Sequence, residues 1–268
     1  MKSTRRSISL IAAIAALFVV CVSTAAQPAA EMRRVLAPSG KLRVGVYPGS
    51  PTSMIQDASS GQRKGVTYDL GTELAKRLAV PFEPVVFQRV AEVVDALKSG
   101  QVDFTITNAS PARVKDLDFT PSVLDLELGY LVLSGSPVSA LASVDRRGIR
   151  VGVSEGSTSL STLSREFKNA TVVTAPSLKS AMEMLSQKTI DAFATNKAIL
   201  FEMSDELPNS RVLDGRWGLE HLAMAIPKGR DAAMPYLRTF AEETKSEGLV
   251  QRAVERAGLR GTVRAELP

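Results

Sequence analysis

The residue best suited to bind a small anion is Arg113, which lies shortly after an apolar stretch. Asn108 and Ser110 precede it, and Pro111 directly follows Ser110. Serine followed by proline is typical of a helix N-terminus. An arginine one turn into such a helix can donate two parallel hydrogen bonds to a carboxylate. The segment therefore predicts a carboxylate site, although an ordinary helix cap has the same pattern.

A second candidate segment contains Gly156, Ser157 and Thr158, again directly after an apolar stretch. Glycine and hydroxyl residues in the first turn of a helix leave backbone N–H groups open to an anion. Alone, this segment also fits an ordinary cap. Two such segments that face each other at equivalent strand ends can instead hold one carboxylate between them.

The elements that must position these residues follow a pattern that occurs twice. Residues 42–46 (LRVGV) recur as residues 149–153 (IRVGV), and each copy precedes a helical stretch and another apolar run. A strand, a helix and a strand in this order indicate a βαβ unit with parallel strands. Both helical stretches end in a leucine that precedes an aspartate by six positions, and these pairs are Leu97 with Asp103 and Leu185 with Asp191.

Two βαβ units predict an α/β fold of two Rossmann-like lobes with parallel-type sheets. Parallel sheets bind ligands at the carboxyl ends of their strands, so we expect a ligand cleft between the lobes. Two strands should cross between the lobes and act as a hinge. The expected divisions are a first lobe over residues 41–133, a second lobe over 134–222, and a return to the first lobe with C-terminal helices over 223–268.

The N-terminal sequence predicts a secretory signal peptide over residues 1–26, followed by an N-terminal tether over 27–40. Lys2, Arg5 and Arg6 precede an uncharged apolar run at residues 8–22, and small residues follow. The run is shorter than the roughly 20 apolar residues that span a bilayer, which favours cleavage over a membrane anchor. We therefore expect a periplasmic protein.

Composition argues against several other classes of function. Three of the positive charges behind the formal net charge of +5 lie in the signal peptide, which leaves +2, and aromatic residues make up 5%. Neither value favours a nucleic-acid-binding surface. The single cysteine lies in the signal peptide, and the single histidine, His221, has no spaced partner for a metal. We expect a monomer without disulfide, metal or cofactor.

The chain resembles the amino-acid-type periplasmic solute-binding proteins of ABC importers, known as solute-binding family 3, which have the type II periplasmic binding protein fold. The resemblance covers nearly the whole mature sequence. It implies that Arg113, helped by Ser110, binds the α-carboxylate of a ligand, and that the lobes close and present it to ABC permease membrane subunits. The strings that carry it are KLRVGV at 41–46, LKSGQVD at 97–103, SPAR at 110–113, DFT at 118–120, VGVSEGST at 151–158, IDAF at 190–193 and AIPKG at 225–229.

Departures from the family's pattern bear on the choice of ligand. The resemblance implies an aspartate for the ligand's ammonium where this chain has Asn196, and a neutral amide supplies no charge. Val90 stands where relatives often have an aromatic residue. Tyr47, at the end of the first strand, is the aromatic candidate for the ligand face. With Arg89 and Arg113 but no obvious acid, the site is expected to favour a ligand more negative than a neutral amino acid. The alternative for Arg89 is a solvated cation at a helix start.

Transport is the leading interpretation: capture of an amino acid or related small carboxylate by lobe closure, without chemistry. The alternative is a secreted dehydratase on the same fold, similar to cyclohexadienyl dehydratase. That reaction needs a general acid, for which Glu155 is the only candidate. A secreted sensor or scavenging protein that meets no permease would use the same site.

Overall fold

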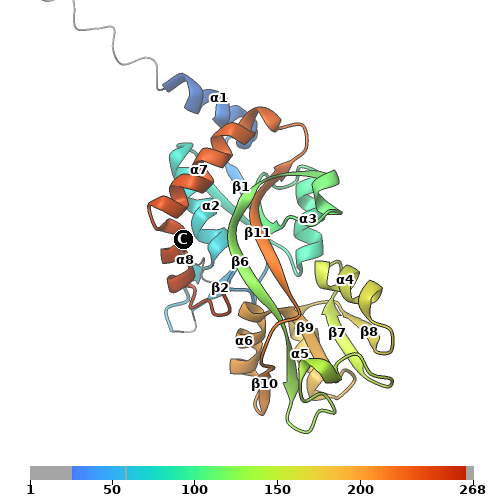
Figure 1. The fold of residues 1–268 in the computed structure, drawn as a ribbon. Helices are drawn as coiled ribbons and strands as arrows, with labels where there is room; N and C mark the ends of the chain where they lie inside the picture. The colour runs from blue at the N-terminus through green and yellow to red at the C-terminus, as the bar shows by residue number, and fades with distance from the viewer. Residues whose placement is uncertain (1–25, 58, 264–268) are drawn as a thin grey trace, which may run out of the picture.

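The computed structural model describes residues 26–57 and 59–263, which form two lobes joined by two long strands (Figure 1). All but the last residue of the predicted signal peptide lies outside this part of the chain. None of the described helices is long and apolar enough to cross a membrane. The helix α1 (Ala26–Leu36) takes up most of residues 27–40, the predicted tether.

The first lobe combines residues from both ends of the described chain. Its N-terminal part contains β1 (Leu42–Val46), β2 (Ile55–Gln56), β3 (Arg63–Lys64), α2 (Val66–Arg77), β4 (Phe82–Val86), α3 (Val90–Lys98) and β5 (Thr105–Asn108). Its C-terminal part contains α7 (Met234–Ser246) and α8 (Leu249–Arg256).

The second lobe is a continuous part of the chain that alternates strands and helices. It contains β7 (Arg150–Ser154), α4 (Thr158–Glu166), β8 (Thr171–Ala175), α5 (Leu178–Ser186), β9 (Ala192–Asn196), α6 (Lys197–Glu206) and β10 (Ser210–Val212). In this lobe β7 lies between β8 and β9 and is parallel to both. In the first lobe β1 and β4 are also parallel. The predicted βαβ units are therefore present in both lobes.

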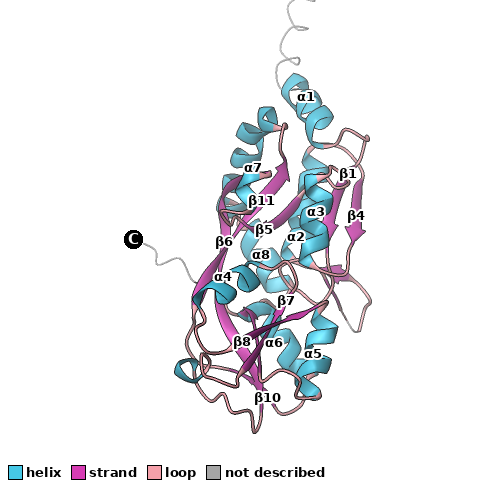
Figure 2. Cartoon of the chain, turned by 90° about the vertical axis from the view of Figure 1, so that its right-hand side faces the viewer, coloured by secondary structure: helices cyan, strands magenta, loops and turns pink. Residues whose placement is uncertain are grey.

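Two long strands, β6 (Leu117–Leu133) and β11 (Gly218–Pro227), cross between the lobes and run antiparallel to each other. Figure 2 shows them extending from one lobe to the other. Leu128 marks the point where β6 changes lobes, because it pairs with Gly218 of β11 and with Asn196 of β9. The register of β6 and β11 shifts near Ala223, and such bulges bend and twist a strand pair. These crossing strands make the seven-stranded sheet mixed, while the pairs of β1 with β4 and of β7 with β8 and β9 are parallel, as the sequence predicted.

The repeated sequence pattern corresponds to the same salt bridge in each lobe. In the first lobe the Arg43 guanidinium donates to both carboxylate oxygens of Asp103, at 2.8 and 2.7 Å. In the second lobe Arg150 donates to Asp191 in the same way, at 3.1 and 2.8 Å. Each pair ties the first strand of its lobe to the segment that follows the second helix, which explains why arginine and aspartate recur together.

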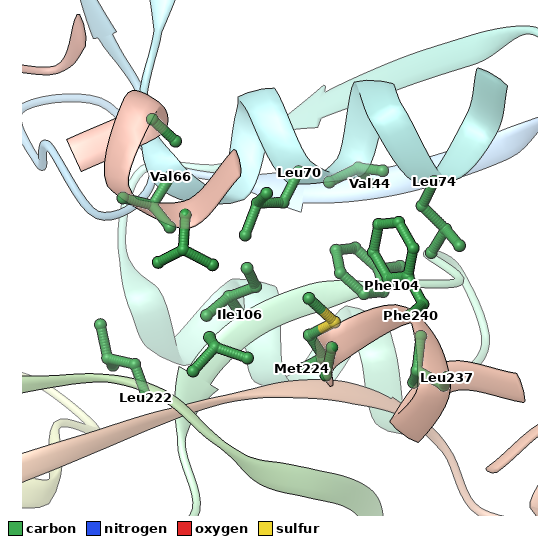
Figure 3. Packing of buried hydrophobic residues seen from close by; sticks show 14 of the residues in the cluster. Val44, Val66, Leu70, Leu74, Phe104, Ile106, Leu222, Met224, Leu237 and Phe240 are labelled. Atoms are coloured by element: carbon green, nitrogen blue, oxygen red, sulfur yellow. The ribbon is translucent and has the colours of Figure 1, made fainter. Parts of the chain in front are cut away.

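Each lobe has its own apolar core. In the first lobe, Val66, Leu70 and Leu74 lie at helical spacing along one side of α2 and are almost fully buried, and they pack towards β1, β5, β11 and α7 (Figure 3). In the second lobe, adjacent residues of β6 belong to separate cores, with Tyr130 in one and Leu131 in the other. Because successive strand residues point to opposite faces, this alternation shows that helices cover both faces of the sheet.

Candidate functional site

A cavity lies between the lobes at the carboxyl ends of the parallel strands, the position that the sequence predicted for a ligand. Both lobes and the crossing strand β11 contribute to its wall. The polar residues of the wall are Tyr47, Thr52, Gln88, Arg89, Thr107 and Arg113 from the first lobe, Ser154, Ser157, Thr158, Ser159, Ser177, Thr195 and Asn196 from the second, and Glu220 from β11.

Arg113 is the most deeply buried cation of this wall, with only 7% of its surface exposed. One guanidinium nitrogen donates to Thr107 Oγ1 at 2.6 Å, and another reaches the backbone carbonyl of Gly156 at 3.5 Å. Among the described residues, no carboxylate lies within ion-pair distance of Arg113. Burial lowers the pKa of Arg113, and the negative charge of Glu220 opposes this effect. A buried cation without an ion-pair partner is costly, so this guanidinium is suited to receive an anion.

The segment before Arg113 differs from the predicted helix N-terminus. Arg113 begins a 3-10 turn of three residues, and β6 begins at Leu117. A longer helix cannot form here, because β6 begins at Leu117 and pairs with β11 from that residue on. The prediction of a helix opened by Ser110 is therefore wrong. Ser110 instead supports the turn, since its carbonyl and hydroxyl oxygens accept from the Arg113 backbone N–H at 2.9 and 3.4 Å.

The second lobe directs three helix N-termini at the cavity. Ser157 caps α4 by accepting from the Leu160 N–H, Ser177 caps α5 by accepting from the Ser180 N–H, and both distances are 3.1 Å. Asn196 caps α6. The positive ends of helix dipoles favour negative charge nearby. The Gly156–Thr158 segment thus opens a helix at the cavity, as predicted.

Several contacts join the lobes across the cleft. The Asn108 side-chain amide donates to Thr158 Oγ1 at 3.1 Å, so Asn108 bridges the lobes and is not part of the cavity wall. Gly156 has φ +65°, and a Cβ atom there would lie 2.5 Å from Cβ of Ala91 in α3. The turn before α4 therefore packs closely against the first lobe.

Arg89 and Glu155 form another contact between the lobes. Their charged groups lie 3.0 Å apart, and Glu92 lies 3.5 Å from the same guanidinium. Two carboxylates therefore offset the charge of Arg89, although its side chain also lines the cavity. Glu155, the predicted general acid, has a half-exposed side chain in this ion pair and is not part of the cavity wall.

The sequence did not identify Glu220 as a site residue. The structure places this residue in the cavity wall, so the cavity contains an acid that the sequence analysis did not expect. Its carboxylate accepts a hydrogen bond from the Asn196 side-chain amide at 2.8 Å. Burial raises the pKa of Glu220, while the bond from Asn196 and the charge of Arg113 oppose the rise. The available signal was a charged residue at the start of the late apolar strand, next to His221.

Comparison with known proteins places the chain in a family. Residues 42–258 match the bacterial extracellular solute-binding proteins, family 3. Because this match covers most of the sequence, the chain belongs to that family. The two lobes and the cavity between them agree with this assignment to a class of binding proteins.

Individual relatives have low sequence identity to this chain, and the solved structures among them have a similar fold. The chain is 24% identical to the ABC transporter glutamine-binding protein GlnH of Bacillus subtilis (strain 168) over 212 residues, which covers 78% of this chain and 77% of that protein. It superposes with a TM-score of 0.75 and 18% identity on an amino acid ABC transporter substrate-binding protein from Streptococcus pneumoniae bound to L-arginine, covering 84% and 97% of the two chains. An ancestral amino acid-binding protein, a precursor of cyclohexadienyl dehydratase, gives 0.72 and 22%, with coverage of 84% and 98%.

Proposed function

We propose that this protein is the periplasmic substrate-binding component of an ABC importer and captures an amino acid or a related small carboxylate. The observation that carries the proposal is Arg113, a buried guanidinium in the cavity with no carboxylate partner among the described residues. Two relatives are named as glutamine-binding proteins, which supports the choice of ligand class, and the name of one of them as an ABC transporter protein supports the choice of partner. The partners are then the small-molecule ligand and the membrane subunits of a permease, and the protein acts as a monomer.

In this proposal Arg113 binds the ligand's carboxylate with two of its N–H groups, and Thr107 and Ser110 hold the arginine in place. The N-terminus of α4, formed by Gly156, Ser157 and Thr158, adds donors from the second lobe. Tyr47 lies at the end of β1 and contributes an aromatic surface beside the ligand. Because the carboxylate bridges donors of both lobes, its binding stabilises the closed arrangement.

The proposed function includes no catalytic step. A dehydratase needs an acid directed at the leaving hydroxyl, and Glu155, the candidate from sequence, pairs with Arg89 outside the cavity wall. Glu220 does line the cavity, and a turnover assay tests it as an acid as well. A prephenate turnover assay tests this part of the proposal, because conversion of prephenate to phenylpyruvate, with loss of water and carbon dioxide, at a rate above background would contradict it.

A thermal-shift screen tests the proposed ligand class. The protein is first unfolded and refolded to remove any carried ligand, then melted with L-amino acids, dicarboxylates and aromatic carboxylates. A ligand at about 100 times its dissociation constant adds about 2.7 kcal/mol of stability, so the melting temperature should rise clearly for at least one amino acid. If no small carboxylate stabilises the protein, the proposal is wrong.

The transport role has its own test, because a sensor or scavenging protein would bind the same ligands. The expected result is that the ligand-loaded protein stimulates ATP hydrolysis by a permease complex in proteoliposomes. Ligand binding without stimulation by any permease complex of the same cell would contradict the transport role.

A further inference from the structure

Among the described residues that line the cavity, the acidic side chain is Glu220, at the end of β11 nearer the second lobe. It lies on β11 two residues after Gly218, where β6 and β11 separate towards the second lobe. Its carboxylate faces the same cavity as Arg113 and accepts from Asn196. A carboxylate in this position is the natural partner for a cationic group of a ligand.

The orientation of Asn196 supports this role for Glu220. The Asn196 side-chain oxygen accepts from the Ile199 backbone N–H at 3.1 Å and so caps α6. Its NH₂ group must then point the other way, and it donates to Glu220. Asn196 therefore presents a donor to the carboxylate, and the strong acceptor in this part of the cavity is Glu220.

The charges of the cavity form two separate poles. Arg113 and Glu220 both line the cavity, but they do not form a salt bridge. Their charged atoms therefore lie more than 4.0 Å apart. Arg89, the other cation in the wall, is offset by Glu155 and Glu92. What remains is one positive and one negative pole, an arrangement that complements a zwitterion and disfavours a dianion.

We propose that Glu220 binds the ammonium group of the ligand and makes the site selective for α-amino acids over carboxylates that lack an ammonium. The proposal rests on the proposed function, since Arg113 must hold the α-carboxylate at the opposite pole. It replaces the expectation of a ligand more negative than a neutral amino acid, which depended on the apparent absence of an acid. Glu220 thus supplies the charge that Asn196 lacks.

The test compares amino acids with analogues that differ only in the ammonium group. Calorimetric titrations use the twenty standard L-amino acids and, for each one that binds, its des-amino analogue, such as glutaramate for L-glutamine. The wild-type protein should bind the amino acid roughly 10- to 100-fold more tightly, as expected for a hydrogen-bonded charged group. This ratio needs no variant and is therefore independent of any effect on folding.

Glu220→Gln keeps the size of the side chain and an acceptor for Asn196 but removes the charge. It should reduce the ratio to about one by weakening amino-acid binding alone. Glu155→Gln is the matched control: it removes the same charge from an acid near the cleft that does not line the cavity, and the ratio should stay at the wild-type value.

The outcomes separate the two proposals. A wild-type protein that binds amino acid and analogue equally, or a Glu220→Gln variant that keeps the ratio, overturns the role of Glu220 and leaves the proposed function intact. If neither amino acids nor their analogues bind, the proposed function fails and the role of Glu220 fails with it.

Discussion

The guanidinium of Arg89 in the first lobe lies 3.0 Å from the carboxylate of Glu155 in the second, so this ion pair spans the cleft. Opening of the lobes must separate the two charges. The pair is partly exposed, with 29% and 50% of the side chains accessible, and such pairs contribute modestly because water and salt screen them.

Replacing Arg89 with Gln should therefore weaken ligand binding by about two- to fivefold, which corresponds to the free energy of an exposed ion pair. The loss should shrink at high salt, because salt already weakens the pair in the wild type. Titration calorimetry at low and high ionic strength measures both effects. Arg165→Gln, which removes a cation paired only with the adjacent Glu166, is the control and should leave affinity unchanged. An equal loss in both variants would contradict a specific role of the pair.

Gly156→Ala should hinder closure of the lobes. The added Cβ would lie 2.5 Å from Cβ of Ala91, well inside van der Waals contact. We expect an affinity loss of at least about tenfold, the result of roughly 1.4 kcal/mol of closure energy, and small-angle scattering should show a more open shape with ligand present.

The control for this change is Gly258→Ala. Gly258 has φ +62°, close to that of Gly156, but no atom within 4 Å of the added Cβ. Both variants carry the backbone penalty of a left-handed alanine, roughly 1–2 kcal/mol, and should lose similar stability. Only Gly156→Ala should lose affinity, and an equal loss of affinity in both would remove the steric explanation.

Asp103→Asn should destabilise the protein more than Asp191→Asn does. Asp103 is fully buried and pairs with both Arg43 and Arg230, whereas Asp191 pairs with Arg150 alone and its side chain is 12% exposed. Removing one partner from a buried ion pair costs about 3–5 kcal/mol, because it leaves the other charge uncompensated. Urea unfolding of the two variants measures the difference, and a larger loss for Asp191→Asn would contradict the explanation.

The raised pKa of Glu220 predicts how ligand affinity depends on pH. Burial raises this pKa in the free protein, and a ligand ammonium binds the charged form and lowers it again. Amino-acid binding should therefore release a proton, and affinity should fall as pH decreases through the raised pKa, above the usual value for glutamate of about 4.3.

The contribution of Glu220 to the stability of the free protein should change with pH in the opposite direction to the ligand affinity. Because the folded pKa exceeds the unfolded one, the contribution of Glu220 is fully present below the unfolded pKa and is lost as pH rises through the folded pKa. Calorimetry of amino-acid binding in buffers of different ionisation enthalpy counts the protons that are released on binding. Glu220→Gln should release fewer, and identical proton release in the two proteins would show that another group titrates.

Much of the fold follows from the sequence because its two halves repeat a local pattern. The strings around Arg43 and Arg150, each with its later aspartate, predicted two βαβ lobes, and both lobes contain the corresponding salt bridge. The antiparallel pairing of β6 and β11 depends on contacts about 100 positions apart, and the local pattern gave no information on it.

The site was only partly predictable for a similar physical reason. The Gly156–Thr158 segment acts locally, as a helix start, and the structure has a helix there. The helix expected at Ser110 gave way to the strand pairing of β6, which is a tertiary effect. Glu220 was missed because Asn196, its hydrogen-bond partner, and Arg113, the opposite pole, are distant in sequence and meet only when the lobes are built.

The central claim is that Arg113 binds the carboxylate of the ligand, and titration of Arg113→Ala tests it most directly. Arg165→Ala, which removes an exposed arginine from the second lobe, serves as the control. The amino acid that binds most tightly to the wild type is titrated into all three proteins after thermal melts show that each is folded. Removal of a buried charged partner costs about 2–5 kcal/mol, so Arg113→Ala should bind at least about 30-fold more weakly, and Arg165→Ala as tightly as the wild type. A folded Arg113→Ala protein with wild-type affinity would contradict the account.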